Sequence, residues 1–320
     1  MLDAALLDAL RTRPHHAPAW HALHDAAPTA KPDRARYAEV LEQQTVGLSS
    51  DAPAQWLRAG LLFMLTHEDH HLLAMAAQLP SLEEGKLTRL AVLRLLLSTY
   101  ALNKLSGHQE TSDLLGRLRW HEHLADAATQ LAQSGAWPDR PVITQPHERR
   151  VLLLCSELST LSHPPTRLAW EQARLLKQMG YEVRILSPQE TQCPDLALHC
   201  GAPITPSLQP RRKSEWQETL GHDLKVWASD PSTPMERRWT ELHAQIATFQ
   251  PGLVLCIGMG SPAQSLLAPL VPVVTLNTIG VPLGGPADVQ LLSRPEAWTI
   301  PGQALQFAYR SSVEQAVISA

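Results

Sequence analysis

The chain has few cysteines, little net charge and no long apolar run, and each absence excludes a class of protein. Its 4 cysteines show neither a C-x-x-C motif nor a disulfide framework, which fits a reducing compartment. A net charge of -4, with both signs interspersed, gives no electrostatic reason to expect a nucleic-acid partner. The apolar stretches are too short to span a membrane, and the first residues lack the apolar core of a secretory signal. We therefore expect a cytoplasmic protein with no membrane span.

The fingerprints of several common enzyme classes are missing as well. The sequence contains no G-x-G-x-x-G, no Walker A motif and no G-x-S-x-G, which argues against a dinucleotide enzyme, a P-loop enzyme or an α/β-hydrolase complete in this chain. Hydrophobic residues make up 44% of the chain, so disorder is not expected. A length of 320 residues is sufficient for two domains with separate cores.

One short motif suggests metal chemistry. Residues 67–71, HEDHH, match the H-E-x-x-H spacing that places two zinc-binding imidazoles and a glutamate acting as general base on one helix. Asp69 and His70 between them are polar, although this turn of a zinc-hydrolase helix packs in a core. Candidates for the third ligand lie in no recognisable motif: His108, His121 and His123. Because 15 histidines make such spacings common by chance, we predict a solvated helix end and no metal site.

Residues 1–136 have the pattern of an all-α domain. Apolar residues recur at spacings of three and four, as in Leu2, Leu6, Leu7 and Leu10, and prolines and glycines separate the helical blocks. No clean period near about 34 residues occurs, so a regular tetratricopeptide array is not supported. We expect an irregular helical domain, followed by a proline-rich linker at 137–150.

Residues 151–320 predict an α/β domain with a Rossmann-like, doubly wound and largely parallel sheet. VLLLCSE is a strand buried on both faces, and a helix from Thr166 to Met179 leads to the strand YEVRILSP. The pattern recurs with a helix at 235–249 and the strands LVLCIG, VPVVTLN and ADVQLL. The proline-containing stretch 189–234 predicts a surface excursion, with one short strand near 197–200.

Three loops are expected at the carboxyl ends of these strands, where ligands bind in open α/β sheets. They are SELSTLSHPPT (156–166), GMGSP (258–262) and NTIGVPLGGPAD (277–288). The first is rich in hydroxyls and leads to a helix start suited to an anionic or hydroxylated ligand, or it is simply a polar loop with a cap. The glycines of the other two allow close backbone approach to a ligand or make tight turns.

Three stretches resemble the first half of GT-B glycosyltransferases. PPTRLAWEQARLLKQMGYEVRILSP is similar to the opening βαβ unit of that fold, and TELHAQIATFQPGLVLCIG resembles a later helix-to-strand step. VPVVTLNTIGVPLGGPADVQLL is similar to a glycine- and proline-containing segment of the O-GlcNAc transferase-like and HMW1C-like protein glycosyltransferases. Members of that group also carry an all-α domain before the GT-B module. The resemblance covers about residues 149–295.

The chain departs from this pattern in two ways. The imidazole of the family's G-H-P step is missing, because its position is Val281 here. The nucleotide-sugar-binding second half has no counterpart before residue 320. We therefore expect a truncated enzyme, an acceptor-side half that works with a partner or self-associates, or a non-catalytic interaction protein with a degenerate GT-B half.

The resemblance implies sugar transfer from a nucleoside diphosphate-sugar donor to a protein or glycan acceptor, without a metal or other cofactor. Inverting transfer needs a general base near the acceptor, for which Glu157 and His163 are the candidates. Substrate contacts are expected from residues at the start of the helix and in the two glycine-containing loops: Thr166, Arg167, Gly258, Gly260, Asn277, Thr278 and Gly280. Glu157 as a surface acid and Asn277 as a turn residue remain the alternatives.

Overall fold

The structure is a computed structural model that describes most of the chain. The described residues are 2–48, 51–82, 86–103, 108–138, 142–190, 224–258, 260–277, 285, 287–292 and 309–317. By their contacts they form two compact units, one ending at Tyr100 and the other beginning at Ala101. The short strand predicted at 197–200 lies outside the described residues.

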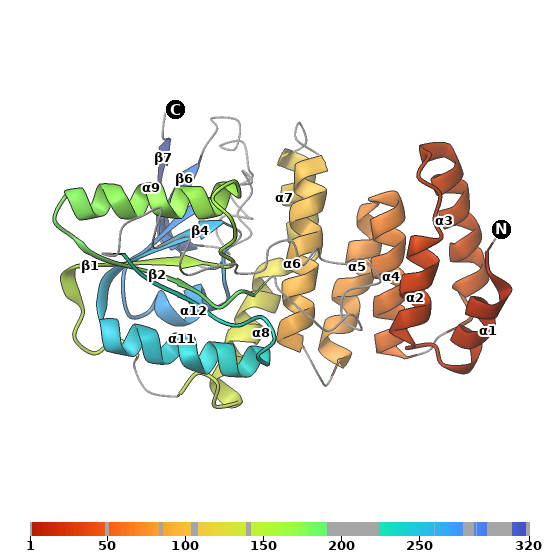
Figure 1. Ribbon diagram of the computed structural model, residues 1–320, viewed down its shortest axis with the longest axis horizontal. Helices are drawn as coiled ribbons and strands as arrows, with labels where there is room; N and C mark the ends of the chain where they lie inside the picture. Colours follow the sequence, from red (N-terminus) through yellow and green to blue (C-terminus); the bar gives the residue numbers. More distant parts are fainter. Residues whose placement is uncertain are drawn as a thin grey trace. The chain divides into compact units, whose positions relative to one another are not determined.

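The described residues of the first unit form helices (Figure 1). These are α1 (Ala4–Thr12), α2 (Ala17–Asp25), α3 (Lys31–Thr45), α4 (Ala52–Thr66), α5 (Asp69–Gln78), the 3-10 turn η1 (Leu79–Ser81) and α6 (Lys86–Asn103), whose last residues belong to the second unit. Asp3 and Asp51 cap α1 and α4, because their carboxylates accept the backbone N–H groups of Ala5 and Ala54 at 2.8 Å. Fully buried side chains such as Trp56 form the core of this unit.

The second unit contains helices and one parallel sheet. The helices are α7 (His108–Arg117), α8 (Trp120–Gln133), α9 (Pro164–Gln178), α11 (Met235–Phe249) and α12 (Ala263–Leu267). The strands are β1 (His147–Cys155), β2 (Glu182–Ser187), β3 (Lys225–Ala228), β4 (Pro251–Gly258), β5 (Val273–Asn277), β6 (Ala287–Leu292) and β7 (Tyr309–Val317). Their order is β3-β2-β1-β4-β5-β6-β7, and each neighbouring pair is parallel. This arrangement contains the Rossmann strand order and confirms the predicted α/β class.

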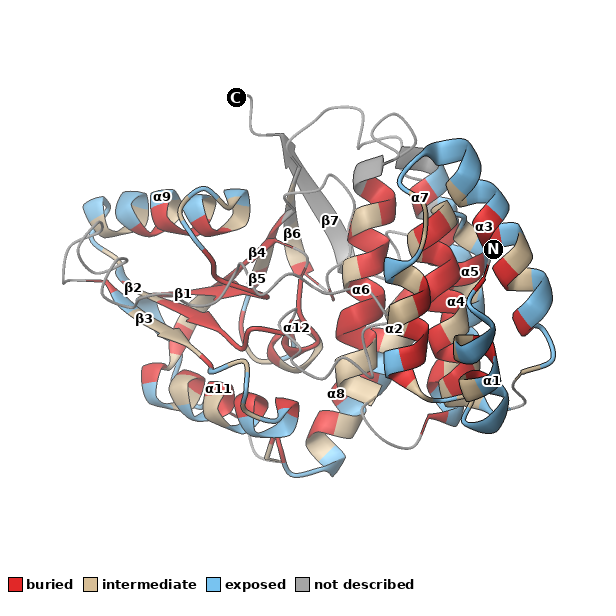
Figure 2. Cartoon of the chain, turned by 45° about the vertical axis from the view of Figure 1, so that its right-hand side comes forward, coloured by how far each residue is buried: buried red, intermediate tan, exposed pale blue. Residues whose placement is uncertain are grey.

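Helices cover both faces of the sheet. Figure 1 shows α9 on one face and α11 with α12 on the other. In Figure 2 the buried residues of α9 and α11 face the strands, and the central strands are buried. Val151, Leu153 and Ile185 fill the core on the α9 face together with Trp170 of α9. Burial on both faces explains why the central strands have continuous apolar runs rather than alternating ones.

The strand β1 begins earlier than predicted. His147 lies inside the predicted linker but pairs with Pro251 at the start of β4. The exposed polar residues at 147–149 hide this extension, because the run becomes apolar only at Val151. The strands β3 and β7 were not predicted either, and β3 is only 4 residues long with a charged first residue, Lys225.

The residues around the predicted linker are held against α11. Gln250, the C-cap residue of that helix, accepts the N–H groups of Thr144 and Gln145 at 2.8 and 2.9 Å and donates to the carbonyl of Val142 at 2.9 Å. The Trp137 ring lies 5.1 Å from the ring of His243 in α11. The helices α7 and α8 belong to the same compact unit as the sheet, although the sequence places the change of pattern near residue 136.

No helix among the described residues has both the length and the apolar character needed to cross a membrane.

Candidate functional site

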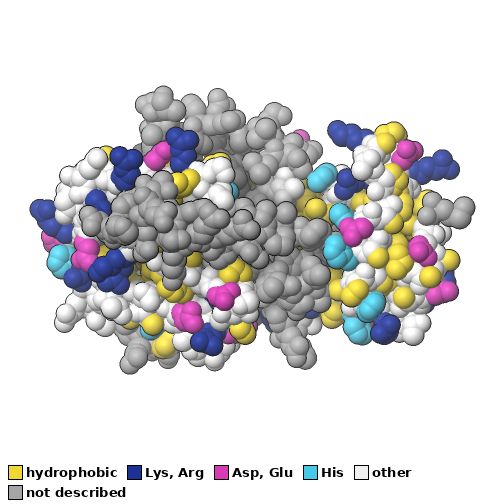
Figure 3. Space-filling model, viewed as in Figure 1, with side chains coloured by type: hydrophobic (Ala, Val, Ile, Leu, Met, Phe, Trp, Pro, Cys, Tyr) yellow, Lys and Arg dark blue, Asp and Glu magenta, His cyan; other side chains and the backbone are white. Residues whose placement is uncertain are grey.

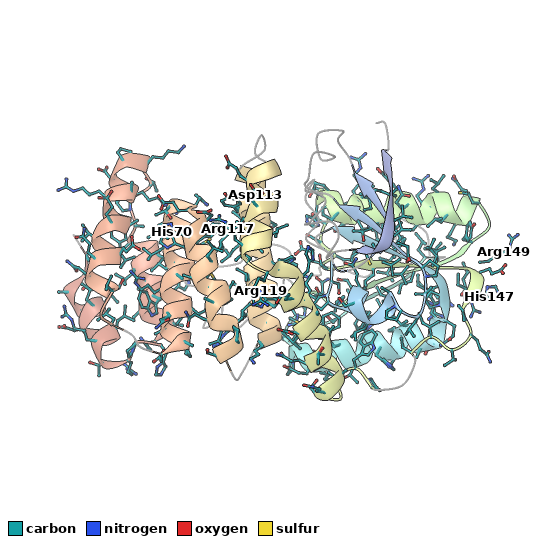
Figure 4. The ribbon with its side chains drawn as sticks, turned by 180° about the vertical axis from the view of Figure 1, so that it is seen from behind. His70, Asp113, Arg117, Arg119, His147 and Arg149 are labelled. Carbon is teal, nitrogen blue, oxygen red and sulfur yellow. The ribbon has the colours of Figure 1, made fainter. Side chains whose placement is uncertain are left out.

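The strand order reverses between β1 and β4. From this pair the chain proceeds outward to β2 and β3 on one side and to β5 and β6 on the other. In open parallel sheets, ligands bind outside the carboxyl ends of the strands at such a point. The loop after β1 carries Glu157 and His163, and β4 ends at Gly258. His147 and Arg149 lie at the amino end of β1, at the opposite end of the strands, and both are labelled in Figure 4.

A chain of hydrogen bonds runs through the first of these loops. The Thr166 hydroxyl accepts the backbone N–H of Ser159 at 2.9 Å and lies 2.9 Å from Nδ1 of His163. Nε2 of the same imidazole lies 3.2 Å from Oε1 of Glu157. Glu157 and Thr166 are buried, with 7% and 0% of their surface exposed. The structure thus brings together three of the predicted site residues, Glu157, His163 and Thr166.

These contacts define the tautomer of His163. Among the described residues, Nδ1 of His163 is the acceptor within reach of the buried Thr166 hydroxyl proton. Nε2 therefore carries the imidazole proton and donates a hydrogen bond to the Glu157 carboxylate. Burial lowers the pKa of His163, and the nearby Glu157 carboxylate offsets part of this effect. The imidazole is neutral at neutral pH and serves as a hydrogen-bond donor to Glu157.

The start of α9 offers fewer free donors than the sequence suggested. Pro164 and Pro165 occupy the first two helical positions and have no backbone N–H. The N–H of Arg167 donates to the carbonyl of His163 at 3.0 Å. The Arg167 side chain is 71% exposed and pairs with Glu171 at 2.8 Å, one turn along the helix. Arg167 therefore lies on the outer surface of α9, apart from the Glu157 chain.

The predicted glycines lie at the carboxyl end of β4. Gly258 has a φ of 101°, a conformation that residues with a Cβ rarely adopt. A Cβ at this position would lie 3.6 Å from the Ser156 hydroxyl and 3.7 Å from Pro165, so the loops after β1 and β4 approach each other here. Gly260 is also in a positive-φ conformation, with φ of 74°. Asn277 ends β5 opposite Gly258.

Part of the predicted site lies outside the described residues. Thr278 and Gly280 belong to this part, and the side chain of Asn277 is not described. Their expected contact with substrate stays a prediction.

Sequence reasoning missed Gln189, which lies after β2. Its side chain is fully buried, and its amide accepts the N–H of Leu158 at 3.3 Å and donates to the same residue's carbonyl at 3.0 Å. The backbone of Gln189 has a φ of 52°, and its carbonyl accepts Nη1 of the buried Arg238 at 2.8 Å. A strained, buried residue of this kind orders the loop that carries Glu157. The rule that ligands bind at the carboxyl ends of parallel strands would have indicated Gln189 if it had also been applied to the strand YEVRILSP, because Gln189 follows that stretch directly.

Three further buried hydrogen bonds connect the loop after β2, the residues that follow β4, and the strand β5. The Ser261 hydroxyl donates to Oε1 of Glu190 at 2.6 Å, and both residues are buried. The amide of Gln264 donates to Thr275 of β5 at 3.0 Å and accepts the N–H of Ser261 at 2.9 Å. The carboxyl edge of the sheet is therefore an ordered polar layer rather than a set of independent loops.

The two cysteines in the central strands are not nucleophiles. Burial raises the pKa of the Cys155 thiol to about 12. Burial also raises the pKa of Cys256, and the neighbouring Cys155 and Glu190 raise it further. Both thiols stay protonated at neutral pH.

The HEDHH stretch does not form a zinc-hydrolase helix. His67 ends α4 in a left-handed conformation with φ of 58°, and α5 begins at Asp69 with Glu68 as its N-cap. The two histidines of the motif therefore belong to different helices. His71 is buried rather than solvated, and burial, followed by the charges of His70 and Arg58, lowers its pKa to about 4.

Comparison of the chain with protein-family models, curated proteins and solved structures found no match.

Proposed function

We propose that the α/β unit is the acceptor-binding half of a GT-B glycosyltransferase, which moves a hexose from a nucleoside diphosphate-sugar to a hydroxyl or amide of a protein or glycan. The Rossmann-like sheet supplies the fold of such a half, and the three resembling segments lie along it. The observation that carries the proposal is the Glu157–His163–Thr166 hydrogen-bond chain at the point where the strand order reverses.

Glu157 is the general base of the proposed reaction. Its carboxylate takes the proton of the acceptor O–H or N–H while the acceptor atom bonds to the anomeric carbon of the sugar. The bond between that carbon and the diphosphate oxygen breaks, and the nucleoside diphosphate leaves with the electron pair.

His163 is a positioning residue in this scheme. Both of its ring nitrogens are engaged, Nδ1 with Thr166 and Nε2 with Glu157, so the imidazole does not take the acceptor proton itself. By donating to one carboxylate oxygen, it fixes the orientation of Glu157. Gly258 and Gly260 allow the acceptor to approach the backbone, whereas the exposed Arg167 takes no part.

The test is calorimetric titration of the folded chain with two sets of ligands. One set is UDP, UDP-glucose and UDP-N-acetylglucosamine, and the other is short peptides with a central Asn, Ser or Thr. We expect a peptide to bind and the nucleotides not to bind. Glu157→Gln should weaken peptide binding about tenfold, because a hydrogen bond to a charged group is lost. Arg167→Ala, in the helix that follows the Glu157 loop, is the matched control, and it should leave peptide affinity unchanged.

Nucleotide binding by the chain would place the donor site within these residues and overturn the assignment of the half. Peptide binding that is indifferent to Glu157→Gln would instead support the interaction-protein alternative.

A further inference from the structure

Three potential metal ligands lie on the last turns of α2. His21, His24 and Asp25 are spaced so that they project from neighbouring positions of one helix surface. One nitrogen of each imidazole and one carboxylate oxygen lie within 4.8 Å of one another. Figure 3 shows that histidine side chains gather on the visible face of this helical unit.

The ligand atoms lie slightly farther apart than they would around a bound zinc ion. Nδ1 of His24 lies 3.4 Å from one oxygen of Asp25, and Nδ1 of His21 lies 3.7 Å from the other. With metal–ligand bonds of about 2.0–2.1 Å, tetrahedral ligands lie about 3.3 Å apart. Small side-chain rotations would close this difference, chiefly of Asp25, which is 64% exposed, whereas His21 and His24 are 22% and 20% exposed.

Among the described residues, the Asp25 carboxylate forms no ion pair with a Lys or Arg side chain. In the described part of the chain, its ion-pair partners are the two imidazoles. Nδ1 of His21 is buried and has no hydrogen-bond partner among the described residues. An unpaired buried nitrogen costs free energy, and a cation between it and the carboxylate would satisfy both groups.

A second cluster of the same ligand types differs in charge. Glu42, His70 and His71 also place their ligand atoms within 4.8 Å of one another. Here Nη2 of Arg58 lies 3.7 Å from the Glu42 carboxylate, and hydrogen bonds to the Glu42 carbonyl at 3.1 Å and to Thr45 at 3.0 Å hold the guanidinium in place. Glu68 also pairs with Nδ1 of His70, which is labelled in Figure 4, at 3.3 Å. A fixed guanidinium beside the carboxylate repels a divalent cation.

We propose that His21, His24 and Asp25 bind one divalent transition-metal cation of the zinc class, with the fourth position taken by water. Imidazole and carboxylate ligands favour such an ion over Mg²⁺ or Ca²⁺, which prefer sets of oxygen ligands. The site is independent of the proposed sugar transfer, which uses residues of the α/β unit.

The test uses the untagged full chain, treated with a chelator and dialysed, in calorimetric titrations with ZnCl2 and MgCl2. We expect one equivalent of Zn²⁺ to bind and Mg²⁺ not to bind. Asp25→Asn and His24→Gln should each weaken Zn²⁺ binding tenfold or more, while circular dichroism shows that both variants stay folded. His70→Gln, from the cluster with the guanidinium, is the matched control and should leave the affinity unchanged, as should Glu157→Gln.

No Zn²⁺ binding by the wild-type chain would overturn the proposal. It would also be overturned if His70→Gln abolished the binding while Asp25→Asn preserved it, because the ion would then occupy the other cluster.

Discussion

Thr166 links two parts of the candidate site through one hydroxyl. It accepts the Ser159 N–H and donates to Nδ1 of His163, and it is fully buried. Thr166→Val keeps the shape of the side chain but leaves both partners without their bond. We expect the free energy of unfolding to fall by about 1–3 kcal/mol, as for buried polar groups left unsatisfied, measured by urea denaturation.

The neighbouring Arg167→Ala is the control for this change. Its side chain is 71% exposed and, among the described residues, pairs along the helix surface with Glu171, so the expected loss is within about 0.5 kcal/mol. Equal losses in Thr166→Val and Arg167→Ala would mean that the hydrogen bonds of the Thr166 hydroxyl are not formed.

The burial of the His121 imidazole leads us to predict that the stability of the protein depends on pH. Both ring nitrogens are buried and have no hydrogen-bond partner among the described residues, and burial lowers the pKa to about 4. In the unfolded chain this imidazole becomes protonated below pH 6.5, whereas in the folded chain it becomes protonated only near pH 4. The contribution of the neutral His121 to the free energy of unfolding is therefore fully present above pH 6.5 and is lost as the pH falls from 6.5 to about 4.

The measurement is the free energy of unfolding at pH 7 and pH 5 in the wild type and in His121→Leu. By linkage, His121 accounts for a loss of about 2 kcal/mol between these pH values. The leucine variant should lose less on acidification by about that amount, and its stability at pH 7 should be equal or higher because no unpaired nitrogen is buried. Parallel pH profiles of the two proteins would contradict the prediction.

At the scale of the element, the pairing of β1 with β4 depends on Gly252. A Cβ at this position would lie 2.5 Å from the carbonyl oxygen of His147, which is a backbone atom that cannot rotate away. Gly252→Ala should therefore force the beginnings of the two strands apart and lower the free energy of unfolding by about 1–3 kcal/mol. Chemical denaturation measures this loss.

Gly47→Ala provides the comparison, because no atom of the described residues lies within 4 Å of a Cβ built there. The expected change is within about 0.5 kcal/mol. If Gly252→Ala cost no more than Gly47→Ala, the close approach of β1 and β4 would not exist in solution.

Elements with strong local patterns were predicted well, and those with weak patterns were not. The helix at Met235–Phe249 and the strand at Ala287–Leu292 have the predicted bounds. Apolar periodicity and flanking turn residues mark both of them in the sequence. In contrast, β3 has 4 residues, none of them fully buried, and lies at the edge of the sheet. Only the pairing with β2 makes this stretch a strand, and a single sequence carries no signal for that pairing.

At the scale of the whole molecule, the two compact units predict separate responses to core mutations. Leu61 in α4 and Leu153 in β1 are both fully buried, each in a different unit. Each change to alanine should cost about 2–5 kcal/mol in its own unit. Hydrogen exchange read by mass spectrometry should then speed up in the helices of the first unit for Leu61→Ala and in β1, β2 and β4 for Leu153→Ala. Faster exchange in both units for either variant would show that they unfold together.

The sequence by itself determined the helical first part of the chain, the buried strands and their alternation with helices. Since these are local periodic signals, they were sufficient to predict a parallel, doubly wound α/β sheet. They also indicated the loop that carries Glu157 and His163, because a strand-end rule locates loops without knowledge of contacts.

The tertiary structure alone decided how the side chains of these loops meet. It assigned the proton of His163, turned Arg167 outward and brought Ser261 to Glu190 across a sequence separation of 71 residues. It also separated two histidine clusters of similar composition by the presence of Arg58 in one of them. The physical reason is that secondary structure follows from short-range periodicity, whereas hydrogen bonds and ion pairs depend on distances that only packing sets.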